Sequence, residues 1–360
     1  MKITDKTMNY YDIRERQTKQ LGLILTTLVL VGQGWGLPSN AQLIPQQLET
    51  LSEQKIDSQI SGLRLKHRLT GHTTPIRSLA FSPNSQTVIS GGGTNEPFLK
   101  FWSVKNGNEV DTLRTQNSAI LTLAVSPNGK TLVSSGEDAD IHFWVWPEKD
   151  SKVTFFDHYS YVLALAVTPD SQLVVTGALD GIRVWTLDPP HLLYQLEDFG
   201  TPAYALAMHP NGFLVASGDN EGIVRFWNLR ENTIVSKFEA HSRPISGLAI
   251  TPDQKTLITA SFDGTIKVWD LATGDLLDTW TGHKGRINSI VLSPNGKLLA
   301  SASIDGVRLW RVESGRLLRH LTDHGDWVNA LAFSPDGQYF ASGGFDKVVN
   351  VWEIPTSFYK

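Results

Sequence analysis

Tryptophan recurs along this chain at a nearly constant spacing, and that spacing restricts the fold more than any other feature of the sequence. Seven of the 11 tryptophans belong to the series, and successive members are 42, 41, 42, 42, 41 and 42 residues apart. They are Trp102, Trp144, Trp185, Trp227, Trp269, Trp310 and Trp352. A period of about 40–45 residues is typical of an array in which each repeat is one four-stranded unit. The sequence therefore predicts seven equivalent units.

Each unit repeats the same order of apolar runs and turns. An alternating apolar run such as Ile245–Ile250 comes first, and a turn such as Ser-Pro-Asn or Thr-Pro-Asp follows it. Proline presets the backbone for a turn, and Asn, Asp and Gly tolerate the less common dihedral angles. Three further short runs complete the unit, one of them ending at the recurring tryptophan. Because one small sheet cannot bury both of its faces alone, the units must stack on one another.

The chain resembles the WD-repeat (WD40) β-propeller family from about Leu63 to Pro355. Gly71-His72 and Gly282-His283 match the Gly-His that opens a WD repeat, and Trp269-Asp270 matches the Trp-Asp that closes one. Residues other than Asp follow the remaining tryptophans of the series. The predicted fold is all-β, a seven-bladed β-propeller of four-stranded antiparallel blades.

The N-terminal side of the repeats carries one surplus strand. Leu63–His72 resembles the fourth strand of a unit but precedes the first complete one, and only eight residues follow Trp352. An unpaired strand edge invites pairing with other chains. We therefore expect this N-terminal strand to pair with the last blade and close the ring.

The first 41 residues resemble a secretory signal peptide. Residues 1–20 hold five basic and three acidic residues, Leu21–Val31 is an apolar run of 11, and Ser39 and Ala41 form a small-x-small cleavage site. Two alternatives are an uncleaved anchor that tethers the protein to a membrane through residues 21–37, and an N-terminus with neither role. A signal peptide on such a propeller points to an extracytoplasmic protein (periplasm, lumen or secreted) of a bacterial-type cell.

Residues 42–62 are rich in Gln, Ser and charged residues, which is typical of a linker. The predicted organisation is a signal peptide or membrane anchor over residues 1–41, a linker over 42–62 and the propeller over 63–360.

Several classes of chemistry are disfavoured by the composition. The chain has no cysteine, which excludes disulfides and thiolate metal sites, and its formal net charge of −4 argues against a nucleic-acid partner. No phosphate loop, calcium loop or His-Glu-x-x-His motif occurs, so we predict neither a cofactor nor a metal. The histidines outside the repeat pattern lack the spacing of metal ligands: His67, His142, His191, His209 and His320.

Four units share a set of His, Ser or Thr, Asp and Trp. In each, the His lies 22 residues before the Asp, and the Ser or Thr lies four residues before it. The sets are His158, Thr176, Asp180 and Trp185; His241, Thr259, Asp263 and Trp269; His283, Ser301, Asp305 and Trp310; and His324, Ser342, Asp346 and Trp352. A catalytic triad is needed once, whereas this set recurs, so we predict a structural tetrad and no enzyme.

Three units depart from this set. The second has Gln116 in place of His, and the fourth has Phe199 in place of His and Glu221 in place of Asp. The first keeps His72 but has a longer turn, Gly91–Phe98. We expect incomplete hydrogen-bond networks in these three units.

The resemblance implies that partners bind at one mouth of the channel. The residues that correspond to this face lie three and five positions after the opening His and one before the tetrad Asp. They are Arg77, Tyr161, Leu163, Leu179, Tyr204, Phe262, Arg286, Asn288, Ile304, Trp327, Asn329 and Phe345. Trp, Tyr and Arg dominate interface hot spots, and Arg286, Trp327 and Phe345 lie in adjacent units.

The predicted function is that of a non-catalytic scaffold that binds a protein or peptide partner at this mouth. Two alternatives are an exported propeller enzyme (a quinone-dependent dehydrogenase or a hydrolase) and a glycan-binding module that uses the aromatic mouth.

Overall fold

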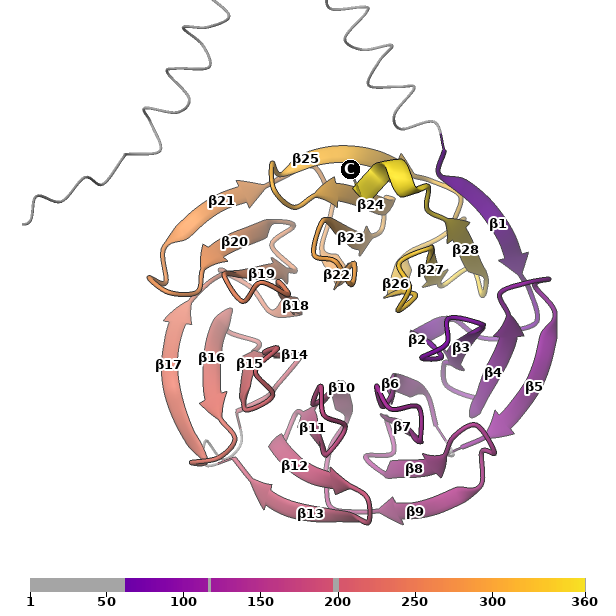
Figure 1. Ribbon diagram of the computed structural model, residues 1–360, viewed down its shortest axis with the longest axis horizontal. Coiled ribbons are helices and arrows are strands. Elements are labelled where there is room, and N and C mark those ends of the chain that lie inside the picture. Colours follow the sequence, from indigo (N-terminus) through magenta and orange to yellow (C-terminus); the bar gives the residue numbers. More distant parts are fainter. Residues whose placement is uncertain (1–61, 116–117, 197–200, 360) are drawn as a thin grey trace, which may run out of the picture. The chain divides into compact units, whose positions relative to one another are not determined.

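Seven four-stranded antiparallel sheets are arranged as the blades of a ring (Figure 1). The computed structural model describes residues 62–115, 118–196 and 201–359. In these ranges the only helix is a single 3-10 turn, η1 (Thr356–Tyr359). The predicted all-β, seven-bladed propeller is confirmed.

The first strand of each blade lies nearest the centre of the ring and the last lies at its rim (Figure 1). The strands of blades 1–3 are β2 (Ile76–Phe81), β3 (Thr87–Gly92), β4 (Phe98–Ser103) and β5 (Glu109–Arg114); β6 (Ile120–Val125), β7 (Thr131–Gly136), β8 (Ile141–Val145) and β9 (Ser151–Phe155); and β10 (Val162–Val167), β11 (Leu173–Ala178), β12 (Gly181–Leu187) and β13 (Pro190–Gln195).

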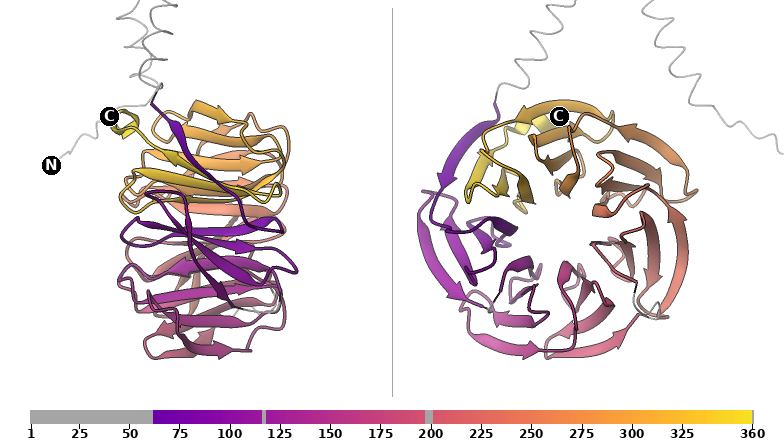
Figure 2. Two further views of the ribbon diagram at one scale, coloured as in Figure 1. Left: turned by 90° about the vertical axis from the view of Figure 1, so that its right-hand side faces the viewer. Right: turned by 180° about the vertical axis from the view of Figure 1, so that it is seen from behind.

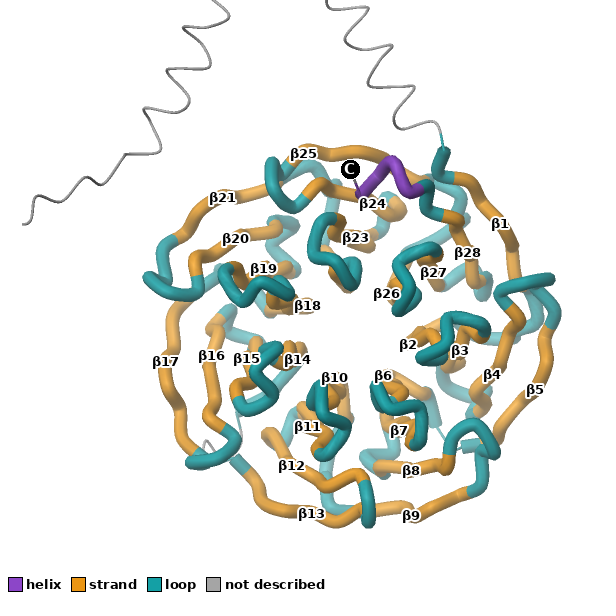
Figure 3. Tube along the Cα trace, viewed as in Figure 1, coloured by secondary structure: helices purple, strands orange, loops and turns teal. Residues whose placement is uncertain are grey.

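Blades 4–7 continue in the same order. Their strands are β14 (Ala205–Met208), β15 (Leu214–Gly218), β16 (Ile223–Asn228) and β17 (Thr233–Glu239); β18 (Ile245–Ile250), β19 (Thr256–Ser261), β20 (Ile266–Asp270) and β21 (Leu276–Trp280); β22 (Ile287–Leu292), β23 (Leu298–Ser303), β24 (Gly306–Arg311) and β25 (Arg316–Leu321); and β26 (Val328–Phe333), β27 (Tyr339–Gly344) and β28 (Val349–Glu353). Loops join the strands on both faces of the ring (Figures 2 and 3).

The ring closes through β1 (Arg64–Leu69), which is the fourth strand of blade 7. It pairs antiparallel with β28, from Arg64 opposite Glu353 to Leu69 opposite Val349. The last sheet therefore has the order β1-β28-β27-β26, in which the two ends of the propeller meet. The predicted closure by an N-terminal strand is confirmed.

The apolar core lies between neighbouring blades. One cluster joins Val133 and Phe143 of blade 2 to Trp185 of blade 3, and an equivalent cluster joins Val184 of blade 3 to Trp227 of blade 4. The recurring tryptophan of a blade thus packs against the face of the preceding blade. This contact explains the constant period, because each unit must present the same apolar surfaces to its two neighbours.

No helix in the described ranges is long and apolar enough to cross a membrane. The predicted signal peptide or anchor (residues 1–41) and residues 42–61 of the predicted linker lie outside the described residues.

Candidate functional site

In six of the seven blades, a β-bulge near the start of the innermost strand directs one side chain into the centre of the ring. In β2 the register skips from Ile76 to Ser78, so Arg77 has no partner in the ladder. A bulge re-aims a side chain and disrupts pairing locally. Arg77, Leu121, Leu163, Ser246, Asn288 and Asn329 occupy this position in all blades except blade 4. All six line a central cavity, together with Tyr204 of blade 4.

This cavity has a volume of about 410 Å³ and two chemically different halves. Blades 2, 3 and 4 contribute the mainly apolar half, which is lined by Leu121, Thr122, Leu123, Leu163 and Tyr204. Blades 5, 6, 7 and 1 contribute the other half, which we call the polar half because its bulge positions carry Ser246, Asn288, Asn329 and Arg77; apolar residues such as Leu79, Phe262, Ala330 and Leu331 also line it. The two groups of blades lie on opposite sides of the ring, so the two halves face each other (Figure 1).

Two of the polar side chains are used to hold neighbouring blades together. The Ser246 hydroxyl donates to the Ile287 carbonyl at 2.5 Å, and the Asn288 amide donates to the Val328 carbonyl at 3.0 Å. By contrast, Arg77 Nε and Asn329 Nδ2 are buried without a hydrogen-bond partner among the described residues. Since buried donors are nearly always paired in folded proteins, these two are candidate donors to a ligand.

Two arginines and three aromatic residues contact one another in series and form a feature that we call the Arg–aromatic arc: Phe262, Arg286, Trp327, Phe345 and Arg77. Of these, Phe262, Arg286 and Arg77 line the cavity. The Arg286 guanidinium lies 5.2 Å from the Phe262 ring and 4.4 Å from the Trp327 ring. Trp327 meets Phe345 edge to face at 6.0 Å, and Arg77 lies 4.8 Å from the Phe345 ring. Cation–π contacts hold each arginine in place while leaving the edges of its guanidinium free to donate.

The structure brings most of the residues predicted for the mouth together, but not all of them. Tyr161 and Ile304 are 47% and 46% exposed and do not line the cavity. Leu179 is half-buried, and its N–H donates to the Tyr161 carbonyl at 3.2 Å. None of these three residues is part of the cavity lining.

At the bulge position, sequence reasoning missed two cavity residues, Leu121 and Ser246. Both lie five positions after the opening position of their unit, as Arg77 and Asn329 do, so the same offset would have found them. Their small or apolar side chains did not suggest binding. The bulge directs the side chain at this position into the cavity, whatever the residue type.

The four tetrads form continuous hydrogen-bonded chains inside their blades. In blade 6, His283 Nδ1 contacts Asp305 at 2.8 Å and Nε2 contacts the Ser301 hydroxyl at 2.6 Å, while Trp310 Nε1 donates to that hydroxyl at 2.8 Å. The same three contacts recur in blades 3, 5 and 7. Ser301 is fully buried, so no substrate can reach it as a nucleophile.

In the tetrad of blade 6 the negative charge is on the carboxylate of Asp305. Burial lowers the pKa of His283 to about 4, which keeps the imidazole neutral at pH 7. Burial acts against ionisation of Asp305, but hydrogen bonds and charges from His283 and Arg308 outweigh it and lower its pKa to about 2. A neutral imidazole between an ionised carboxylate and a hydroxyl fits a structural network.

Blade 1 pairs its His with an acid from an unexpected position, but His72 Nδ1 is left without a hydrogen bond among the described residues. The longer turn Gly91–Phe98 supplies Glu96, whose Oε2 lies 3.1 Å from His72 Nδ1. The same oxygen accepts hydrogen bonds from the backbone N–H groups of Thr73 and Thr74 at 2.9 and 3.0 Å. Because the longer side chain of Glu approaches from a longer turn, a fixed offset from His72 could not find it.

Blade 4 keeps an acid at its network, but it is Asp219 and not the predicted Glu221. Asp219 is buried and forms an ion pair with Arg225, and Trp227 Nε1 donates to the Ser217 hydroxyl at 2.8 Å. The backbone N–H of Glu221 donates to Asp219 at 2.9 Å. Phe199, the predicted substitute for His, lies outside the described residues.

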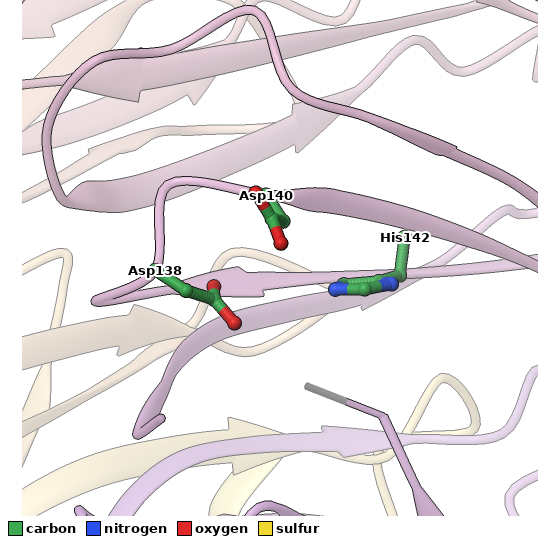
Figure 4. A group of neighbouring side chains, drawn as sticks. All are labelled: Asp138, Asp140 and His142. Atoms are coloured by element: carbon green, nitrogen blue, oxygen red, sulfur yellow. The ribbon is translucent and has the colours of Figure 1, made fainter. Parts of the chain in front are cut away.

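Blade 2 has a different polar cluster. Trp144 Nε1 donates to Ser134 at 3.2 Å, and Gln116 lies outside the described residues. Asp138, Asp140 and His142 each offer a ligand atom, and these atoms lie within 4.8 Å of one another (Figure 4). Burial and the Asp138 charge raise the pKa of Asp140 to about 6.

Comparison with known protein families gives a match in every blade. A family model described as "WD domain, G-beta repeat" matches residues 63–103, 107–145, 149–186, 192–228, 232–270, 274–310 and 315–353. These segments cover most of the chain.

Similar curated proteins match a smaller part of the chain. "B-type cell cycle switch protein ccs52B" of Medicago truncatula is 37% identical over 125 residues, which are 34% of this chain and 26% of that protein. "Protein FIZZY-RELATED 3" of Arabidopsis thaliana is 35% identical over the same shares. "Anaphase-promoting complex subunit cdh1" of Dictyostelium discoideum is 32% identical over 33% of this chain and 16% of its own length. The chain thus spans about a quarter or less of these relatives.

These relatives correct the predicted location. Their names are those of cell-cycle proteins from eukaryotes, which contradicts an extracytoplasmic location and gives no support to a bacterial-type exported protein or to a membrane tether. The prediction depended on an apolar run of 11 residues followed by small residues, a pattern that composition alone can produce.

Proposed function

The chain belongs to the WD40 repeat family, and from that premise we propose that it is a non-catalytic scaffold that binds a peptide segment of a protein partner in the central cavity. The observation that carries this proposal is the Arg–aromatic arc, of which Arg77, Phe262 and Arg286 line the cavity. Arginine and aromatic residues are the usual anchors of protein interfaces, and here four consecutive blades supply them.

The two halves of the cavity indicate the chemistry of the segment. Arg77 Nε and Asn329 Nδ2 are buried donors without partners among the described residues, and they suit a carboxylate or a main-chain carbonyl of the ligand. Leu121 and Leu163 on the opposite side suit an apolar side chain. The volume of about 410 Å³ lies in the lower part of the usual range for ligand pockets, so it holds a short segment. We therefore propose a ligand that presents an acidic and an apolar side chain close together.

The relatives support binding over catalysis. One of them is named as a subunit of an anaphase-promoting complex, which describes a protein assembly and no reaction. Because the aligned part is about a third of this chain, this name supports a protein-binding role without assigning a partner. The exported-enzyme alternative has lost its premise, since the predicted location is contradicted.

The proposal is tested by selecting binders from a random peptide display library and measuring their affinity by calorimetry. Arg286→Ala and Arg77→Ala should each weaken the selected peptides at least about tenfold, because truncating a hot-spot anchor removes more than about 1.4 kcal/mol. Selected peptides should be enriched in Asp or Glu next to an apolar residue.

The matched control is Arg316→Ala, which removes an exposed arginine from the outermost strand of blade 6. This variant should bind as the wild type does. Peptides that bind all three variants equally well would place the binding site elsewhere and contradict the proposal. Thermal melting of each variant separates lost binding from lost folding.

A further inference from the structure

Blade 2 has a histidine at a position of its third strand where the other six blades have Lys, Arg or Asn. The residue opposite the tetrad Ser or Thr is basic in five blades: Lys100, Arg183, Arg225, Lys267 and Arg308. In blade 2 this residue is His142, opposite Ser134, and in blade 7 it is Asn350. The register of the strands thus places an imidazole where most blades have a fixed positive charge.

In three other blades the basic residue forms an ion pair with the acid of the same blade. Arg183 contacts Asp180 at 3.0 Å, Arg308 contacts Asp305 at 2.6 Å, and Arg225 pairs with Asp219. Blade 2 has two acids on the turn between β7 and β8, Asp138 and Asp140, and a ligand nitrogen in place of the guanidinium. Blade 2 therefore lacks the positively charged arginine of those three blades and has in its place side chains that can bind a cation.

His142 provides an independent indication of a ligand. Its side chain is more than nine-tenths buried, and its Nε2 has no hydrogen-bond partner among the described residues. The ring nitrogen farther from the backbone points toward the two carboxyl groups (Figure 4). A buried imidazole nitrogen is normally paired with a donor, an acceptor or a metal.

The other ring nitrogen of His142 is held by a neighbouring strand. Nδ1 lies 3.0 Å from the Thr154 hydroxyl of β9. With the Nδ1 hydrogen donated to that hydroxyl, the lone pair of the ring is on Nε2, which is the usual arrangement of a histidine that binds a metal. The Ser135 hydroxyl donates to the Asp140 carbonyl at 2.7 Å and holds the turn that carries the two acids.

We propose that Asp138, Asp140 and His142 form a site for a divalent transition-metal ion, with Zn²⁺ as the best-fitting ion. Two carboxylates neutralise its charge, and an imidazole favours zinc over Mg²⁺ or Ca²⁺, which prefer oxygen ligands alone. The three ligand atoms converge within 4.8 Å, and zinc bonds of about 2.0–2.2 Å require the carboxylates to close further by side-chain rotation. Three protein ligands leave the fourth position of the ion to water.

This site fastens the β7–β8 turn to the strand that follows it, as the ion pair of Asp305 with Arg308 does in blade 6. The bound ion should therefore stabilise the folded chain, because binding only to the native state raises its stability. The inference is independent of the peptide-binding proposal, since none of the three residues lines the central cavity.

The test uses the full chain after treatment with a chelator and measures ZnCl₂ binding by calorimetry, together with the thermal midpoint with and without zinc. We expect one ion per chain at this site and a higher midpoint in zinc. Asp140→Asn and His142→Gln should each weaken binding at least about tenfold, because each removes a ligand while nearly preserving shape. MgCl₂ at the same concentration should give no binding.

The control is His191→Gln, an exposed histidine on β13 in blade 3 that should leave zinc binding unchanged. Absence of zinc binding by the wild-type chain, or unchanged binding by both ligand variants, would overturn the proposal. Circular dichroism in zinc-free buffer establishes that both variants are folded. The visible spectrum of bound Co²⁺ gives a second readout, because loss of the His142 nitrogen should change its absorption bands.

Discussion

Single buried hydroxyls connect the polar groups inside the complete blades. Ser301 contacts His283 Nε2 and accepts a hydrogen bond from Trp310 Nε1, and it is fully buried. Ser301→Ala therefore leaves two buried nitrogens without a partner, and it should lower the free energy of unfolding by about 1–3 kcal/mol. Urea unfolding followed by tryptophan fluorescence measures this loss.

Blade 2 provides the matched control for that substitution. Ser134 is equally buried, but within the described residues its hydroxyl has a single contact, the bond from Trp144 at 3.2 Å. Ser134→Ala should destabilise the protein less than Ser301→Ala. Equal losses would show that the histidine contributes nothing to the network.

Two glycines in the turns between strands have similar backbone angles but different surroundings. Their substitutions therefore distinguish backbone strain from steric crowding of a new side chain. Gly222 has φ of +85° and Gly274 has φ of +78°, both in the left-handed region. A Cβ on Gly222 would lie 2.0 Å from the His241 carbonyl oxygen, whereas a Cβ on Gly274 meets no atom within 4 Å.

Alanine at these two turns should therefore have different effects. Gly274→Ala should lower the free energy of unfolding by about 1–2 kcal/mol, the strain of a side chain in the left-handed region. Gly222→Ala adds a backbone clash and should lose at least about 2 kcal/mol more. Equilibrium denaturation of both variants checks the difference, and equal losses would mean that the β15–β16 turn relaxes freely.

For the whole molecule, stability depends on closure of the ring. β1 covers the edge of β28, and Leu69 packs in the cluster that contains Ile76 and Trp102. Deleting residues 63–70 exposes that edge and opens the contact between blades 7 and 1. We therefore expect the shortened chain to unfold at a lower urea concentration than the wild type. Leu69→Ala keeps the strand and should lose about 2–5 kcal/mol through the cavity it leaves.

A deletion of residues 42–60 is the control for the loss of chain length. It leaves β1 intact and should keep the wild-type midpoint. A 63–70 deletion that unfolds at the same midpoint as this control would contradict the role of β1 in closure.

Much of the propeller could be predicted from the sequence because its determinants are local and repeated. The tryptophan period predicts seven blades, since each blade must present the same surfaces to both neighbours. The surplus strand at Leu63–His72 predicts closure, because an unpaired strand edge needs a partner. The His, Ser or Thr, Asp and Trp residues of four blades could be paired by spacing alone, because their offsets are constant wherever the strands and turns keep their lengths.

Where strand pairing or turn length departs from the repeat, only the tertiary structure decides the outcome. The bulges that turn Leu121 and Ser246 into the cavity depend on how two strands pair, and no residue type marks them. Glu96 reaches His72 only because its turn is longer, and the meeting of His142 with Asp138 and Asp140 depends on the pairing of β7 with β8. The recurring residues can be read directly from the sequence, because a repeat is a property of the linear chain. The folded chain decided which side chains meet, because contact between strands depends on register and backbone direction in three dimensions.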